Sequence, residues 1–78
     1  MADEFKTVFK RNLRAQLELR DMTREELAAR SGLSLYSVEQ YARGETQPLL
    51  GSAYAIATAL GCTVNDLCAA PPGVAAVQ

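Results

Sequence analysis

The sequence predicts an all-α fold, a compact bundle of five short helices in one domain. Three observations support this prediction: apolar residues recur at helical spacing, capping residues precede most of the apolar stretches, and glycine or proline follows them. No stretch shows the convincing alternation of apolar and polar residues that is typical of a strand. The domain is expected to cover residues 1–70, and residues 71–78 are expected to form a disordered tail.

The first helix is expected to begin at a cap on Asp3 and to end near Leu19 or Arg20. Its apolar stripe recurs at every fourth position, as Phe5, Phe9, Leu13 and Leu17. Because one face of a helix repeats at this spacing, we expect the stripe to pack against the rest of the domain.

The second and third helices have clear boundary residues. Thr23 and Glu26 have the spacing of a capping box at the start of the second helix, and Gly32 is the left-handed residue that ends it. Ser34 is expected to cap the third helix, and Gly44 is expected to end it. A tight glycine turn therefore joins two short helices.

The last two helices follow a loop that ends at Pro48. An alanine-rich helix is expected from about Leu49 to Leu60, and Gly61 ends it. Thr63 caps a fifth helix, which cannot continue into the tail because the tail begins with two prolines.

The composition is that of a soluble globular chain. Apolar residues make up 49% of the sequence and charged residues 22%, and no apolar run reaches the roughly 20 residues of a membrane-spanning helix. We therefore expect a cytoplasmic protein. The net charge of -1 argues mildly against nucleic acid as a partner. However, basic residues gather near the N-terminus, as Lys6, Lys10, Arg11 and Arg14.

Metal, cofactor and catalytic sites are not expected. Cys62 and Cys68 are the two cysteines, the chain has no histidine, and a structural zinc site needs about four such ligands. Cys62 and Leu67 instead occupy the two positions of a hydrophobic staple, so we expect Cys62 to pack. The carboxylates have no histidine or activated nucleophile to pair with, and the sequence has no glycine-rich phosphate loop.

The third helix has two different faces. At about 100° per residue, one side holds apolar residues, with Leu35 at its edge: Val38, Tyr41 and Ala42. The opposite side holds residues that can hydrogen-bond or stack: Tyr36, Gln40 and Arg43. A polar helix face ordinarily meets only water. Here, however, a large aromatic residue, Tyr36, points away from the core. A short helix and a glycine turn also precede the third helix, and this arrangement is the geometry that presents a helix to the major groove of DNA.

The stretch MTREELAARSGLSLYSVEQYARGETQPL and the ending LGCTVNDLC resemble the phage repressor and Cro type of helix-turn-helix, the XRE family. The resemblance covers roughly residues 9–68 and includes the cap, core, turn and loop positions Thr23, Leu27, Ala28, Gly32, Val38, Tyr41, Gly44 and Pro48. It implies a lambda-repressor-like domain in which the second and third helices form the helix-turn-helix. It also implies a sequence-specific transcriptional regulator that binds double-stranded DNA as a homodimer on a palindromic operator.

The sequence departs from the family pattern at three places. Arg24 stands where the family commonly has glutamine, and Glu45 and Thr46 stand where it often has lysine or arginine. The family frequently has a buried Arg–Glu pair between the first and third helices, and Leu17 and Ala42 occupy those positions here. Since both charges are missing together, we expect an apolar contact between Leu17 and Ala42.

Four residues of the third helix are candidates for base contact. The amide of Gln40 can pair bidentately with adenine, and Tyr36 can pack on a thymine methyl group or reach a phosphate. Ser37 is a weaker candidate. Glu39 can accept a hydrogen bond from cytosine, but its charge repels phosphate, so a purely solvated role stays open. For Gln40 the alternative is an ordinary surface residue, and for Tyr36 it is an aromatic residue exposed at a dimer or crystal contact.

Four residues are candidates for phosphate contact. Thr23 and Arg24 stand at the start of the second helix, where backbone N–H groups favour an anion. Arg43 and Thr46 flank the glycine turn after the third helix, and Arg43 is equally suited to a base.

Two functions stay open from the sequence. The first is a transcriptional regulator, expected to be a repressor that blocks polymerase by occupying its operator. The second is a protein-interaction module on the same fold, such as an antitoxin-like or anti-repressor protein. The pI of about 5.3, Glu39 and Glu45 favour this second function. The fold alone does not separate the two.

Overall fold

The computed structural model describes residues 2–69, and from Phe5 onward it also describes the side chains. This part of the chain forms five α-helices and no strand, which confirms the predicted all-α class. The helices are α1 (Ala2–Leu19), α2 (Arg24–Ser31), α3 (Leu35–Arg43), α4 (Leu50–Leu60) and α5 (Val64–Cys68). The expected tail at 71–78 lies outside the described residues, so its disorder stays a prediction.

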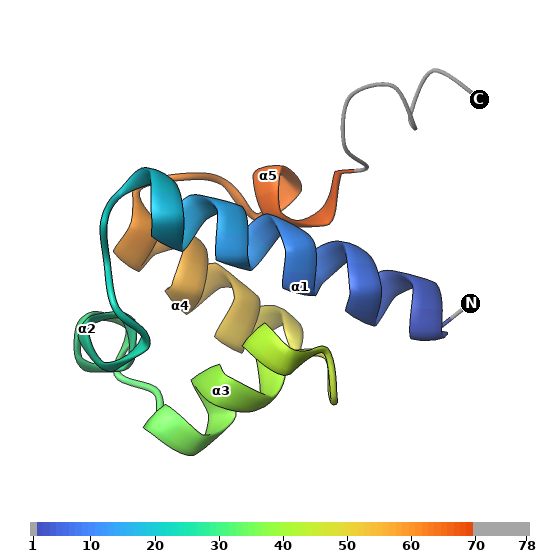
Figure 1. Cartoon of the computed structure of the whole chain (residues 1–78), viewed down its shortest axis with the longest axis horizontal. Helices are drawn as coiled ribbons and strands as arrows, with labels where there is room; N and C mark the ends of the chain where they lie inside the picture. Colours follow the sequence, from blue (N-terminus) through green and yellow to red (C-terminus); the bar gives the residue numbers. More distant parts are fainter. Residues whose placement is uncertain (1, 70–78) are drawn as a thin grey trace.

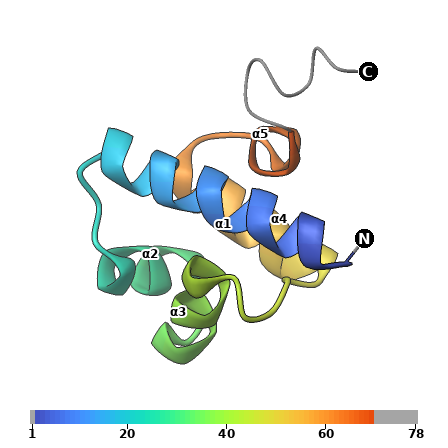
Figure 2. The same ribbon diagram turned by 45° about the vertical axis from the view of Figure 1, so that its right-hand side comes forward.

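The long helix α1 and the helix α4 run through the middle of the molecule. α2 and α3 lie on one side of them, and α5 lies on the other side of α1 from α3 (Figure 1 and Figure 2). α1 packs against both α3 and α5, whereas α2 packs against α3 and α4. Every helix contributes to one apolar core: Phe9, Leu13, Leu17, Leu27, Ala28, Val38, Ala42, Ala53, Ile56, Ala57, Leu60 and Leu67. None of the buried residues in the described part is polar or charged, so apolar burial holds the helices together.

Local sequence signals set the boundaries of α2 and α3 as predicted. The Thr23 backbone N–H donates to Glu26 Oε1 at 2.9 Å, and the Glu26 N–H donates to Thr23 Oγ1 at 3.0 Å, which completes the capping box. Gly32 and Gly44 follow the two helices with φ of 78° and 75°. Glycine adopts this left-handed conformation without strain, so both helices end sharply at these residues.

Two predicted boundaries differ from the structure. α1 begins at Ala2, so Asp3 lies inside the helix, and the prediction that Asp3 caps it is wrong. Alanine is the strongest helix former, which allows the helix to continue past the expected cap. α4 begins at Leu50, slightly later than predicted, and follows Leu49, which is extended and makes no side-chain cap hydrogen bond. A leucine has no side-chain oxygen, so the sequence contained no cap signal there.

The two residues expected to meet between the first and third helices both lie in the core. Leu17 of α1 is 7% exposed and Ala42 of α3 is 0% exposed, and both belong to the same apolar cluster. Because α1 packs directly on α3, these two positions share one interior. Their burial agrees with the apolar character of both positions, and a direct contact between Leu17 and Ala42 stays a prediction.

The two cysteines lie near α5. A second capping box between Thr63 and Asp66 starts this helix, with both hydrogen bonds at 3.0 Å, and the hydrogen bonds from Thr63 lower the pKa of the Asp66 carboxyl. Cys62 packs against the core, as its staple position predicted. Burial raises the pKa of the Cys62 and Cys68 thiols, so both stay protonated near neutral pH.

Neither a metal site nor a membrane-spanning helix is found in the part of the chain that the structure describes. Within residues 2–69, no group of three or more His, Cys, Asp or Glu side chains is placed to hold a metal ion. No helix of this range is both long enough and apolar enough to cross a bilayer.

Candidate nucleic-acid interface

The inner face of α3 is anchored in the core. The hydroxyl of Ser34 caps the helix by accepting a hydrogen bond from a backbone N–H of the first turn at 3.1 Å. Val38 and Ala42 are fully buried. The ring of Tyr41 meets Phe9 of α1 edge to face, with 6.3 Å between ring centroids. These contacts fix the rotation of α3 about its own axis, so its opposite face is held toward solvent.

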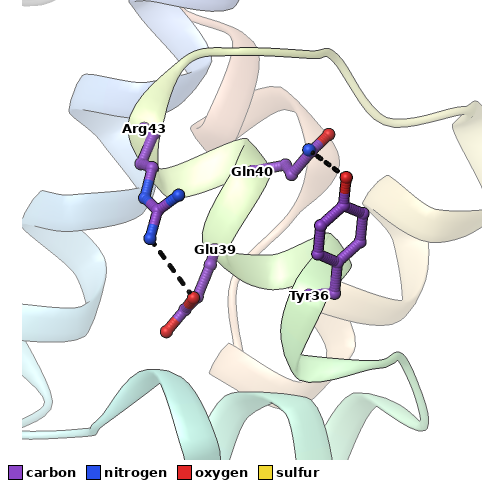
Figure 3. A network of polar contacts seen from close by, with 4 residues as sticks. All are labelled: Tyr36, Glu39, Gln40 and Arg43. Carbon is purple, nitrogen blue, oxygen red and sulfur yellow. Dashed lines mark hydrogen bonds and ion pairs between the residues drawn. The ribbon is translucent and has the colours of Figure 1, made fainter.

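Two side-chain pairs cover this outer face of α3 (Figure 3). The Gln40 amide donates a hydrogen bond to the Tyr36 hydroxyl at 2.7 Å. A guanidinium nitrogen of Arg43 lies 3.5 Å from Glu39 Oε1. Each pair joins residues four positions apart, which are neighbours on a helix surface. The structure therefore brings four of the eight sequence candidates together on one surface, and Tyr36 is its most prominent member at 72% exposure.

The Arg43–Glu39 ion pair is exposed and therefore weak. The Arg43 side chain is 55% exposed and the Glu39 side chain 34%. Exposed pairs at this helical spacing contribute about 0.3–0.5 kcal/mol to stability, because water screens them. A phosphate group can replace Glu39 as the partner of Arg43 at little cost, since charged hydrogen bonds to phosphate are strong. Arg43 is thus available to an anion, and Glu39 places a negative charge beside it.

The start of α3 differs from the expectation at two residues. Ser37 is half-buried, and its backbone N–H and hydroxyl both contact the Ser34 hydroxyl, at 3.1 Å and 3.0 Å, so it is largely occupied by the cap. Leu35 is 38% exposed beside Tyr36, although the sequence placed it at the edge of the apolar face. Leu35 is the first residue of the helix, so no preceding turn covers its side chain. Its place at the start of the helix could have predicted this exposure from the sequence.

α2 and α3 form one structural unit. α2 ends at Gly32, α3 starts after the cap at Ser34, and the two helices pack against each other. Leu27 and Ala28 are the buried residues of α2. The small side chain of Ala28 allows a neighbouring helix to approach closely.

Residues 13–67 match the model of a family described as helix-turn-helix. The chain belongs to the XRE-type helix-turn-helix family. A crystal structure of the hypothetical transcription factor NHTF from Neisseria has the same fold, with a TM-score of 0.84 and 24% identity. The similarity covers 95% of this chain and 85% of that chain. No curated protein matches the sequence. Membership of the helix-turn-helix family supports a DNA-binding regulator.

In this helix-turn-helix domain, the phosphate candidates lie on two separate segments. Thr23 and Arg24 are at the start of α2, where the Thr23 hydroxyl is engaged in the capping box and Arg24 is partly buried. Arg43 ends α3, and Thr46 lies in the bend that follows Gly44. The two segments stand before α2 and after α3, so they flank the helix-turn-helix in the chain.

The sequence placed Lys10 in a basic stretch of α1, but it did not predict which residues lie beside it. Its aliphatic stem lies against Gly44, so closely that a Cβ atom on this glycine would be 3.0 Å from Lys10 Cδ. Lys10 therefore lies beside Gly44, the residue that ends α3 directly after Arg43. Two cations at the C-terminal end of a helix are favoured by its dipole and strengthen the positive potential there. The sequence could show that Lys10 is basic, but this neighbourhood depends on how α1 packs on α3.

Proposed function

We propose that this protein is a sequence-specific, DNA-binding transcriptional regulator that inserts α3 into the major groove of an operator. The outer face of α3 supports this proposal most strongly, because Tyr36 and Gln40 project from a helix whose inner face is fixed in the core. A helix that is already ordered loses little freedom on binding, so its contacts contribute directly to affinity.

The base-contacting set consists of Tyr36, Ser37, Glu39 and Gln40. Gln40 pairs with an adenine through its amide, and Tyr36 lies beside it in the groove. Glu39 tolerates only a base edge that donates a hydrogen bond, as cytosine N4 does. Ser37 contributes least, because the helix cap already engages its polar groups.

The phosphate-contacting set consists of Thr23, Arg24, Arg43 and Thr46. The backbone N–H groups at the start of α2 attract one phosphate, with Arg24 beside them. Arg43 binds a second phosphate after it leaves Glu39. Lys10 adds positive potential to this second contact. These contacts position α3 on the duplex and contribute affinity for any DNA sequence.

The protein acts as a homodimer on a palindromic operator. It represses transcription because the bound dimer blocks polymerase. It is located in the cytoplasm, on the DNA of the nucleoid. A surface at the start of α4 suits a second copy: Leu49 is 81% exposed and Leu50 is 76% exposed. No charged residue occurs from Thr46 to Asn65, so two copies of this segment would meet without charge repulsion. The measured mass in solution should therefore be that of a dimer, with or without DNA, and Leu50→Asp should shift it toward the monomer.

Selection of duplexes from a random pool tests the proposal. We expect one enriched, palindromic sequence, and an affinity that falls steeply as salt increases, because phosphate contacts release counterions. Failure to bind any duplex at low salt and high protein concentration would contradict the proposal.

The second candidate is a protein-interaction module of the antitoxin-like or anti-repressor kind. Two observations favour it: Glu39 stands on the outer face of α3, where it repels phosphate, and the chain has a net charge of -1. A stable complex with another protein in the absence of DNA, together with no selected duplex, would support this candidate.

A further inference from the structure

The hydrogen bond between Gln40 and Tyr36 already exists in the protein without DNA, at 2.7 Å. We infer that Tyr36 is a positioning residue that holds the Gln40 amide in the orientation that reads adenine and rejects guanine. The inference rests on the proposed function. According to this inference, Tyr36 and Gln40 do not contact bases independently. The Tyr36 hydroxyl instead sets which edge of the Gln40 amide faces the DNA, and Gln40 contacts the base.

The helix geometry explains why these two side chains meet. Gln40 and Tyr36 are four positions apart on α3, so they lie on adjacent turns of the same face. Side chains of a helix lean toward its N-terminus, which directs the Gln40 amide back onto the turn that holds Tyr36. In Figure 3 the two side chains point toward each other, and the Arg43–Glu39 pair lies apart from them on the same helix.

The remaining hydrogen-bonding groups of Gln40 match adenine. A glutamine amide has two N–H donors and one oxygen acceptor. One N–H is bonded to the Tyr36 hydroxyl, so one donor and one acceptor remain. Adenine presents one acceptor, N7, and one donor, the N6 amino group, in the major groove. The free N–H and the oxygen of Gln40 are therefore complementary to adenine N7 and to the adenine N6 amino group.

The same count explains the rejection of guanine. Guanine presents two acceptors in the major groove, N7 and O6. An unrestrained glutamine can turn its amide nitrogen, with either N–H, toward N7 or O6. Gln40 has only one free N–H while it is bonded to Tyr36, so its oxygen would face a guanine acceptor. An unmatched polar contact in a closed interface is unfavourable, and this mismatch creates the discrimination.

The variant Tyr36→Phe tests the inference, because it removes the hydroxyl and keeps the ring. Tyr54→Phe is the matched control: it makes the same change at a tyrosine that is 66% exposed on α4. Affinity for the selected operator is compared with affinity for a second duplex. In the second duplex, the adenine whose recognition depends on Gln40 is replaced by guanine, and the paired thymine is replaced by cytosine. We expect Tyr36→Phe to reduce the adenine-over-guanine ratio of affinities about three- to tenfold, the effect of one neutral hydrogen bond. Tyr54→Phe should leave the ratio unchanged.

Two further readouts separate positioning from a structural role. In a Gln40→Ala background, Tyr36→Phe should not change the ratio further, because no amide remains to be positioned. In the free protein, the NMR signals of the Gln40 side-chain amide protons should shift in Tyr36→Phe and stay in place in Tyr54→Phe. The melting temperature should remain that of the parent, because the Tyr36 side chain lies at the surface.

The outcomes distinguish this inference from the proposed function. An unchanged ratio in Tyr36→Phe, with a parent that binds its operator, would overturn the inference and leave the DNA-binding proposal intact. A parent operator without adenine at the position that depends on Gln40 would also overturn it. A parent that binds no DNA would overturn both.

Discussion

The inner and outer faces of α3 belong to the same nine residues but depend on different forces. On the inner face, Val38 and Ala42 are 0% exposed and fixed by the surrounding core. On the outer face, Tyr36 is 72% exposed, and two side-chain pairs are its main internal contacts. Burial of apolar side chains contributes several kcal/mol, whereas the exposed Arg43–Glu39 pair contributes well under about 1 kcal/mol and the Gln40–Tyr36 hydrogen bond about 1 kcal/mol. Stability and recognition are therefore separable within one helix, and substitutions on each face should affect only one of them.

The largest expected effect is on the inner face. Ala42→Glu places an unpaired carboxylate in the core and should lower the free energy of unfolding by several kcal/mol, on the order of 3–5 kcal/mol. Adding Leu17→Arg should recover part of this loss, because it supplies a partner charge from α1. Chemical denaturation measures both variants, with Ala29→Glu, at an exposed position of α2, as the control. A single Ala42→Glu variant as stable as the parent would show that Ala42 does not face the core.

A substitution outside both faces should weaken all DNA binding equally. Arg24→Ala at the start of α2 should reduce the affinity for operator and random duplexes by similar factors. The slope of log K against log salt should fall by about one unit, because one phosphate contact is lost. Binding titrations at several salt concentrations measure both quantities. A loss confined to the operator would mean that Arg24 contacts a base.

A smaller effect is expected from Glu39, the acidic residue of the outer face. Glu39→Gln removes a negative charge and releases Arg43, so affinity for a random duplex should rise about two- to fivefold, while stability changes by less than about 0.5 kcal/mol. Affinity for the operator should not rise, because the hydrogen bond that Glu39 accepts from cytosine is lost. Titration and denaturation of the same preparation compare the two effects. An equal rise on the operator and on the random duplex would instead show that Glu39 contacts no base.

The smallest effect is expected from residues that belong to neither face. Deleting residues 71–78 should change the free energy of unfolding by less than about 0.5 kcal/mol, because this stretch has no cap and no periodic apolar stripe. Thermal unfolding of the full and shortened chains makes the comparison. A melting temperature several degrees lower in the shortened chain would show that the tail packs or dimerises.

The two faces also differ in how well the sequence predicted them. The inner face follows from the helical period of apolar residues, and its boundaries follow from residues such as Ser34 and Gly44, whose chemistry acts locally. Asp21 shows the limit of local signals: it adopts φ of 52° after α1, a conformation that aspartate tolerates but does not require. Asp3 shows the reverse error, a suitable cap residue that the helix passes.

The contacts of the outer face could not be predicted from the sequence alone. Periodicity placed Tyr36, Gln40 and Arg43 on one side of the helix, but the side-chain rotamers that pair them are not a property of spacing alone. The neighbourhood of Lys10 and Gly44 depends on the packing of two helices that are distant in sequence. Such contacts arise from tertiary structure, so no short motif could have predicted them.

The separation of the two faces is tested most directly by Gln40→Ala, measured on the operator and on a random duplex. The side chain lies on the outer face, and its loss should leave the melting temperature unchanged within a few degrees. Binding to the operator should weaken by about 1–3 kcal/mol, the discrimination of one bidentate base contact, and binding to the random duplex should weaken much less. Equal losses on both duplexes, or a large loss of stability, would contradict the assignment of base reading to the outer face of α3.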